Sequence, residues 1–392
     1  MTDCRSNPLA WESAQSLCGR WGWVGLVFAA ACCLTLSSAS SSPIDARGSQ
    51  FIGFKSLSRF QKSPGAQAGE TILVSRVIRS RIPFNQLIAS WNSQTPEGAY
   101  LKVQARALYP SNSTKYYTLG LWSSDPARFP RESVPNQKDA DGDVSTDTLI
   151  LNHPADRVQL RLTLGGAESK LPTIKFLGLC LSDTNVAAPE LPPNRTAWGR
   201  TIPVPERSQM NYPNGKVLCS PTTVSMIMTY WSQQLKRPEL DHDVPDIVKA
   251  VYDAQYDGTG NWPFNMAYAG AYPGMRAYVS RFTDLSEVED WIAAGLPVGL
   301  SVSSARLHHR GPGPNGHLIV CAGFTEDGDL IVNDPGSSKE VRRTYPRKDI
   351  IYAWAYSRNT VYLIYPVGAE IPKDRFGHWD SRMSRRRRIL ER

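Results

Sequence analysis

Cysteine is scarce in this chain once its first 40 residues are set aside. Four of the seven cysteines lie before residue 40, which leaves Cys180, Cys219 and Cys321 for the rest. An odd number of widely separated cysteines argues against a disulfide framework, and their spacing does not match a structural zinc site. We therefore expect no cofactor and no cysteine-bound metal, core positions for Cys180 and Cys321, and one reactive thiol.

A face of concentrated positive charge is also missing. The formal net charge is +8, from 44 Lys and Arg against 36 Asp and Glu, but the run Arg385–Arg388 and its surroundings carry much of the excess. Neither a basic face nor a recognised nucleic-acid-binding motif is present. We expect no nucleic-acid partner and interpret residues 369–392 as a solvated basic tail.

Long hydrophobic runs are limited to one segment. Residues 21–36 are apolar and are followed by Ser and Ala at 37–42. This run is shorter than the roughly 20 residues of a membrane-spanning helix, and its small-residue exit is typical of a secretory signal. We predict that residues 1–42 form a signal peptide cleaved near Ala39, or an uncleaved signal anchor that would hold the chain at the membrane. In both cases the rest would be secreted or lie in the cell envelope.

The next part of the chain has the pattern of β-structure. Residues 43–70 are rich in Ser, Gly and Lys and predict a flexible lead-in, whereas residues 71–185 contain short alternating strands separated by Pro, Gly, Asn and Asp. Such spacing favours an all-β sandwich. We expect an accessory domain that could contact a glycan, the cell wall or the substrate. Four aromatic residues could stack on sugars, although we favour core packing for them: Trp91, Tyr116, Tyr117 and Trp122.

An acidic turn within this region is a candidate calcium site. Asp139, Asp141 and Asp143 alternate over five residues, and their carboxylates are the oxygen ligands that calcium prefers. The full calcium-loop pattern is missing, because no glutamate occupies its twelfth position. We keep structural calcium as an alternative and favour a solvated hairpin turn.

A proline-rich segment at 186–200 predicts an extended linker to a second domain at 201–368. In that domain helical patterns precede strand patterns, and residues 256–272, rich in Gly and aromatics, are interpreted as a loop over a cleft. Helices followed by antiparallel strands indicate an α+β fold.

The chemistry of the second domain centres on Cys219. The segment after it has apolar residues at helical spacing and Pro221 near its start, so we expect the thiol at a helix N-terminus, where its thiolate is favoured. Farther along, His317 begins one strand pattern and Asp334 ends the next, with a turn at 326–328 between them. A hairpin would bring both to the same end, which gives a nucleophile, a base and an orienting carboxylate.

These motifs resemble those of the papain-like cysteine peptidases of the bacteriocin-processing (double-glycine leader) type. The resemblance covers roughly residues 200–366 and rests on five matches in order: Gln209, Cys219-Ser220-Pro221, Gly295-Leu296-Pro297-Val298, Gly316-His317 through Gly323-Phe324, and Asn333-Asp334-Pro335. It implies a papain-like fold in which helices pack on an antiparallel sheet.

The resemblance also implies roles for four residues: Cys219 as nucleophile, His317 as base and acid, Asp334 as its orienting group, and Gln209 as a donor to the oxyanion. Asn211 or Asn214 could replace Gln209. The expected function is hydrolysis of peptide bonds in a peptide or protein substrate through an acyl-enzyme. The alternatives are acyl transfer to an amine, or a binding module that has kept the fold without activity.

Overall fold

A computed structural model describes residues 47–166, 170–313 and 315–374. All of them belong to one compact unit, and none of their helices is long and apolar enough to cross a membrane. The signal segment at 21–36 and the arginine run of the tail lie outside the described residues.

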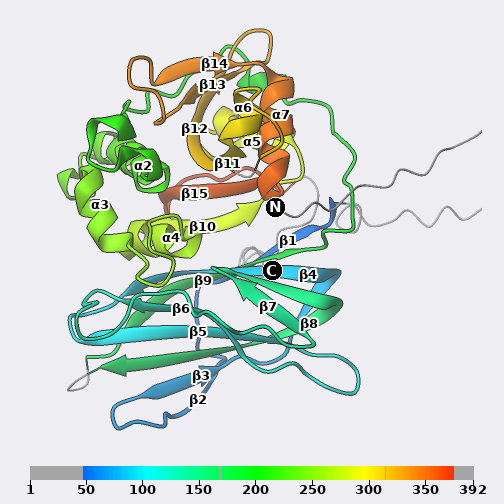
Figure 1. Ribbon diagram of the computed structural model, residues 1–392, viewed down its shortest axis with the longest axis vertical. Helices are drawn as coiled ribbons and strands as arrows, with labels where there is room; N and C mark the ends of the chain where they lie inside the picture. The colour runs from blue at the N-terminus through cyan, green and yellow to red at the C-terminus, as the bar shows by residue number, and fades with distance from the viewer. Residues whose placement is uncertain (1–46, 167–169, 314, 375–392) are drawn as a thin grey trace, which may run out of the picture. The chain divides into compact units, whose positions relative to one another are not determined.

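The N-terminal part of the described chain is built of antiparallel strands, which we call the first sheet (Figure 1). Alternation of buried and half-buried positions along β5 is typical of strands with one face toward a core. Strand β8 is long enough to pair with β4 in its first half and with β3 and β5 in its second. The strands are β1 (Ser49–Phe54), β2 (Gln61–Pro64), β3 (Thr71–Val74), β4 (Ile78–Gln94), β5 (Ala99–Ala107), β6 (Tyr117–Ser123), β7 (Gly142–Ser145), β8 (Thr148–Gly166) and β9 (Thr173–Ser182).

The all-β character of this part agrees with the sequence, whereas its division into two packed layers stays a prediction. Hydrogen bonds join the nine strands in one network, in which β4 and β8 are the longest members. The structure differs from the flexible lead-in predicted at 43–70. The described part of this segment contains β1 and β2, and the β1 residues from Ser49 to Gly53 are buried. Composition misled here, because Phe51 and Ile52 supply enough apolar surface to anchor β1 on β9.

The C-terminal part places helices around a second antiparallel sheet, whose strand order is β10-β15-β11-β12-β13-β14. This mixed content agrees with the α+β prediction. Its helices are α2 (Cys219–Leu235), α3 (Val244–Val251), α4 (Trp262–Ala271), α5 (Leu285–Ala293), α6 (Ser304–Leu307) and α7 (Arg347–Trp354). Its strands are β10 (Met275–Arg281), β11 (Val298–Ser303), β12 (Gly316–Phe324), β13 (Leu330–Asn333), β14 (Arg342–Tyr345) and β15 (Thr360–Pro366). Short 3-10 turns occur at Arg195–Ala197, Gln209–Asn211, Gly215–Val217, Pro238–Leu240 and Ala355–Ser357.

Two segments of this part differ from the sequence prediction. The expected loop at 256–272 contains helix α4, since Asn261 caps its first turn by accepting a hydrogen bond from the Phe264 N–H and Pro263 suits its start. The end of the expected linker is also fixed, because Trp198 and Thr201 form β-bridges with β12.

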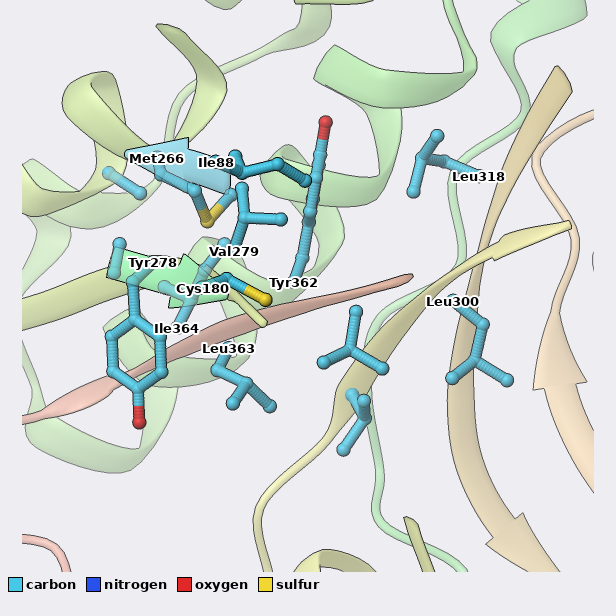
Figure 2. Packing of buried hydrophobic residues seen from close by; sticks show 14 of the residues in the cluster. Ile88, Cys180, Met266, Tyr278, Val279, Leu300, Leu318, Tyr362, Leu363 and Ile364 are labelled. Carbon is cyan, nitrogen blue, oxygen red and sulfur yellow. The ribbon is translucent and has the colours of Figure 1, made fainter. Parts of the chain in front are cut away.

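The two sheets share one core. Ile88 and Cys180 of the first sheet lie beside Val279 of β10 and Met266 of α4 in Figure 2, and all four are buried in a single hydrophobic cluster. The aromatic residues considered for sugar stacking are mostly in this core: Trp91, Tyr117 and Trp122 are buried. Tyr116 is half-buried, with Arg106 and Arg161 over its ring. Core packing therefore accounts for three of the four.

Polar side chains of β4 cover the outer edge of β10. The Asn92 amide donates to the Ala277 carbonyl at 2.6 Å and accepts from the Ala277 N–H at 3.2 Å, while Ser90 Oγ accepts from the Val279 N–H at 2.9 Å. Gly270 of α4 makes room for this contact, because a Cβ there would lie 2.0 Å from Asn92 Nδ2. An edge strand that would otherwise expose unpaired backbone groups is thereby closed.

Replacing this amide should destabilise the whole unit. Asn92→Ala leaves the buried N–H and C=O of Ala277 without partners, so we expect the free energy of unfolding to fall by about 2–4 kcal/mol. Chemical denaturation measures the change, with the exposed Asn112→Ala as the matched control. Equal midpoints for the two variants would contradict this role of Asn92.

Candidate active site

Cys219 is the first residue of α2, a helix whose residues from Ser220 to Ser232 are all buried. The thiol itself is half-buried, and no acidic residue lies in the first turn of the helix. The Thr222 hydroxyl donates to the Leu218 carbonyl at 2.7 Å. The N–H groups of the first helical turn have no acceptor within the helix and point toward its N-terminus, where Cys219 lies. The sequence-predicted setting of a thiol at a helix N-terminus is therefore present.

His317 lies near the start of β12, directly opposite Val302 of the neighbouring β11. Its side chain is buried, and its Nε2 is 2.7 Å from Asp334 Oδ1. The Cys219 thiol also lies close enough to shift the pKa of the ring, through hydrogen bonding and charge. Since Asp334 occupies Nε2, the ring nitrogen left for the thiol is Nδ1.

Asp334 directly follows β13, the shorter strand of the β12–β13 hairpin. Its Oδ1 also accepts from the Gly336 N–H at 2.9 Å, and its Oδ2 accepts from the Tyr345 hydroxyl at 2.7 Å. The backbone at Gly336 lies so close that a Cβ there would be 3.2 Å from both Asp334 Oδ1 and His317 Cε1. The carboxylate is thus buried but has three donors.

The pKa values of the three side chains shift in directions that favour charge separation. Burial alone would raise the pKa of Cys219 and lower that of His317. The hydrogen bond and charge between them reverse both trends, so that the Cys219 pKa falls and, with the help of Asp334, the pKa of His317 rises to about 10. Burial opposes ionisation of Asp334, yet His317, Tyr345 and Gly336 hold its pKa well below the ordinary range. The geometry therefore suits a thiolate beside an imidazolium.

Gln209 lies near this group but faces another residue. Its Nε2 donates to the Gly215 carbonyl at 2.7 Å, and its Oε1 is buried without a hydrogen-bond partner. One of the two amide hydrogens is therefore used to hold the turn that leads into Cys219. The proposed substitutes Asn211 and Asn214 are both exposed.

The structure adds residues that sequence reasoning missed. Tyr345 contacts Asp334 from β14, and the Asp334-Pro335-Gly336 turn supplies a backbone donor. An Asp two residues before a Gly is a turn signal that could have identified Gly336, whereas nothing in the sequence near Tyr345 points to it. His308 follows α6, and its Nε2 is 3.4 Å from the Tyr345 hydroxyl and 4.0 Å from Asp334 Oδ2.

The other candidates for chemistry are engaged elsewhere. Cys180 and Cys321 are buried in the core, and burial raises the pKa of both thiols, to about 12 for Cys321. Asp139, from the acidic turn, accepts from the Tyr117 hydroxyl and pairs with Lys115 Nζ at 2.9 Å. Among the described residues, no group of three or more His, Cys, Asp or Glu side chains is arranged to hold a metal ion. Structural calcium at this turn stays an untested alternative.

Two solved structures show a distant likeness to this chain. A CpGH89 variant from Clostridium perfringens, in complex with its substrate GlcNAc-alpha-1,4-galactose, is 10% identical, with 48% of this chain and 21% of that chain covered and a TM-score of 0.16. This chain therefore spans about a fifth of the length of that relative. The VPA0106 protein from Vibrio parahaemolyticus is also 10% identical, with 81% and 88% covered and a TM-score of 0.17. Neither likeness bears on the fold.

Comparison with protein families is informative for both parts of the chain. No curated protein matches the sequence. Residues 67–182, which include most of the first sheet, match the model of the Peptidase C39 N-terminal domain. Residues 201–362, which include Cys219, His317 and Asp334, match the model of the Peptidase_C39 like family. The chain belongs to the C39-like peptidases, with the N-terminal domain of that group ahead of the peptidase-like region.

Proposed function

We propose that the protein is a cysteine peptidase that hydrolyses peptide bonds through Cys219, His317 and Asp334. The observation that carries the proposal is the arrangement at the start of α2, where His317 is hydrogen-bonded to Asp334 at 2.7 Å and lies close enough to Cys219 for each of the two to shift the pKa of the other. Family membership supports a protease and a peptide or protein substrate. The intact chain of contacts favours an enzyme over a binding module that has lost its activity.

The reaction would begin with attack of the Cys219 thiolate on the carbonyl carbon of the scissile bond. The oxyanion formed would accept hydrogen bonds from the Cys219 N–H and from the second amide hydrogen of Gln209. As the C–N bond breaks, His317 would give its Nδ1 proton to the leaving amine. Water, deprotonated by His317, would then attack the thioester and release the new carboxylic acid and the thiolate.

Asp334 has a supporting part in this proposal. Its hydrogen bond at Nε2 fixes the ring orientation and stabilises the imidazolium, as the carboxylate does in other nucleophile–histidine–acid groups. Tyr345 and the Gly336 N–H hold the carboxylate in place without transferring a proton. They are positioning residues rather than catalytic ones.

Alkylation of Cys219 by iodoacetamide should show the activated pair. Because the Cys219 pKa is lowered, we expect reaction to persist below the range of an ordinary thiol, whose pKa is about 8.5. His317→Ala should move the midpoint above 8.5, since burial remains while the cation is lost. The pH midpoint of Asp334→Asn should lie between those of the wild type and His317→Ala. A midpoint near 8.5 in all three proteins would overturn the assignment of this pair.

Proteolysis should depend on Cys219 alone among the three described cysteines. Cys219→Ala is expected to lower the rate of casein hydrolysis by at least about a thousandfold, while Cys180→Ala and Cys321→Ala, both core positions, retain it.

Adding a small amine such as glycinamide tests the acyl-transfer alternative. Products that carry the amine in place of a free carboxylate would favour transfer over hydrolysis.

The role of Gln209 can be separated from that of a structural residue. Gln209→Ala should reduce kcat by roughly 100- to 1000-fold, the usual effect of removing an oxyanion donor, and leave the pH midpoint of Cys219 alkylation unchanged. If the amide serves only to hold the Gly215 carbonyl, the alkylation rate and the melting temperature would change instead.

We also propose export of the chain and a two-layer arrangement of the first sheet. Export rests on the apolar segment at 21–36 and its small-residue exit. Pairing of β8 with β4 at one end and with β3 and β5 at the other supports a sandwich, because a strand of this length can pass from one layer to the next. The mass of the exported protein would distinguish cleavage near Ala39 from an uncleaved anchor.

A further inference from the structure

A polar cavity of about 180 Å³ lies where the end of β10 meets the ends of β1 and β9. Its walls come from both sheets. Ser49 and Ser182 belong to the first sheet, Arg281 ends β10, and Arg358 and Asn359 precede β15. Cys219, His317 and Asp334 are not among its lining residues. The cavity is therefore separate from the proposed active site.

Arg281 brings a buried positive charge to this cavity. Its side chain is 6% exposed, and its hydrogen bonds go to neutral acceptors: Nη1 to Gln86 Oε1 at 2.7 Å and Nε to Thr360 Oγ1 at 3.4 Å. In the described part of the chain, no carboxylate lies within 4 Å of the guanidinium, and Nη2 has no acceptor. A buried charge normally requires a counterion, so the missing partner is informative.

Arg358 adds a second positive charge to the same cavity. It is exposed, and its hydrogen bond is a long one from Nη1 to the Thr184 carbonyl, at 3.4 Å. Its charge opposes that of Arg281 and, after burial, is a further cause of the lowered pKa of Arg281. Two like charges at one small cavity repel each other, and an anion bound between them would offset that repulsion.

Negative groups near the cavity do not supply that anion. Asp183 lines the cavity, but its Oδ1 accepts from the Asn185 N–H at 3.0 Å and it forms no ion pair with either arginine. Asp284 pairs with Arg47. Asp147 acts on Arg281 only from beyond ion-pair distance, and burial raises its pKa to about 6. Both arginines therefore keep unused donors.

The remaining lining favours an oxyanion. Ser182 Oγ is buried without a hydrogen-bond partner, and Ser182 is one of the lining residues. Guanidinium groups and hydroxyls are the donors that bind phosphate and carboxylate oxygens. A volume of about 180 Å³ accommodates such a group with its nearest waters, but not a folded peptide segment.

We propose that this cavity binds a small oxyanion, a phosphate or the carboxylate of a small acid, between Arg281 and Arg358. The bound anion would offset the positive charge of the two guanidinium groups and connect β9 of the first sheet to β10 of the second. Its occupancy would stabilise the junction of the two sheets, because a ligand that binds only the folded chain shifts the unfolding equilibrium. The proposal is independent of peptidase activity.

The test measures the melting temperature of the full chain against inorganic phosphate, with sodium chloride at matched ionic strength and with acetate as separate series. We expect phosphate to raise the melting temperature beyond the effect of chloride, and titration calorimetry to give a saturable isotherm. A matching effect of acetate would assign the site to carboxylates as well; an effect of phosphate alone would restrict it to phosphate-like anions.

Variants decide whether these arginines form the site. Arg358→Gln, at an exposed position, should weaken phosphate binding at least tenfold, while Arg200→Gln is the matched control, because Arg200 is also exposed and donates to a carbonyl, that of Ala293. Cys219→Ala should bind phosphate normally even if it loses proteolysis, which separates the two proposals. Equal affinity in Arg358→Gln and the wild type, or no effect beyond that of chloride, would overturn the proposal.

Discussion

The contact between Asp334 and His317 is the interaction on which the rest of the site depends. By occupying Nε2, the carboxylate determines that Nδ1 is the nitrogen left for Cys219. The carboxylate can keep its charge in a buried place because a hydroxyl and a backbone N–H share it with the imidazole. The hydrogen bonds that the protein makes to Asp334 therefore influence the ionisation of the Cys219 thiol, although the two residues interact only through His317.

The fold supplies the rigidity that this arrangement requires. Cys219 is at the end of a helix that is buried on every side from Ser220 to Ser232, and its partner is on a strand between two others in the second sheet. The Trp231 indole donates to the Ile364 carbonyl at 2.8 Å, and the Ser220 and Tyr362 hydroxyls are 2.8 Å apart, so α2 is fixed to β15 at both ends. Groups on such elements keep their geometry better than groups on loops.

The sequence was informative where the signals are local. Pro221 and the apolar spacing after it predicted the helix that Cys219 opens, and Gly328 predicted the turn that brings His317 and Asp334 together. Contacts that depend on strand pairing could not be predicted from the sequence. Tyr345 meets Asp334 because β14 pairs with β13, with Leu330 opposite Tyr345, and no local pattern contains that register.

Composition was a poor guide in two places for a related reason. A segment rich in Gly and aromatics became α4, since Gly270 is needed for the close approach of Asn92 and the aromatic Phe264 packs against Trp91. The Ser- and Gly-rich region near residue 50 became β1 because β9 offers it a partner strand. In both cases tertiary contacts outweighed local propensity.

The hydrogen bonds from Asn92 and Ser90 to the edge of β10 have a consequence for the order in which the two sheets fold. The first sheet is complete in sequence at Ser182, almost a hundred residues before β10 emerges during synthesis. N-terminal parts commonly fold first as a chain is synthesised. The first sheet would then be a preformed template, ready to receive the exposed edge of β10 as soon as it appears. The N-terminal region would then act as a folding template for the peptidase-like region.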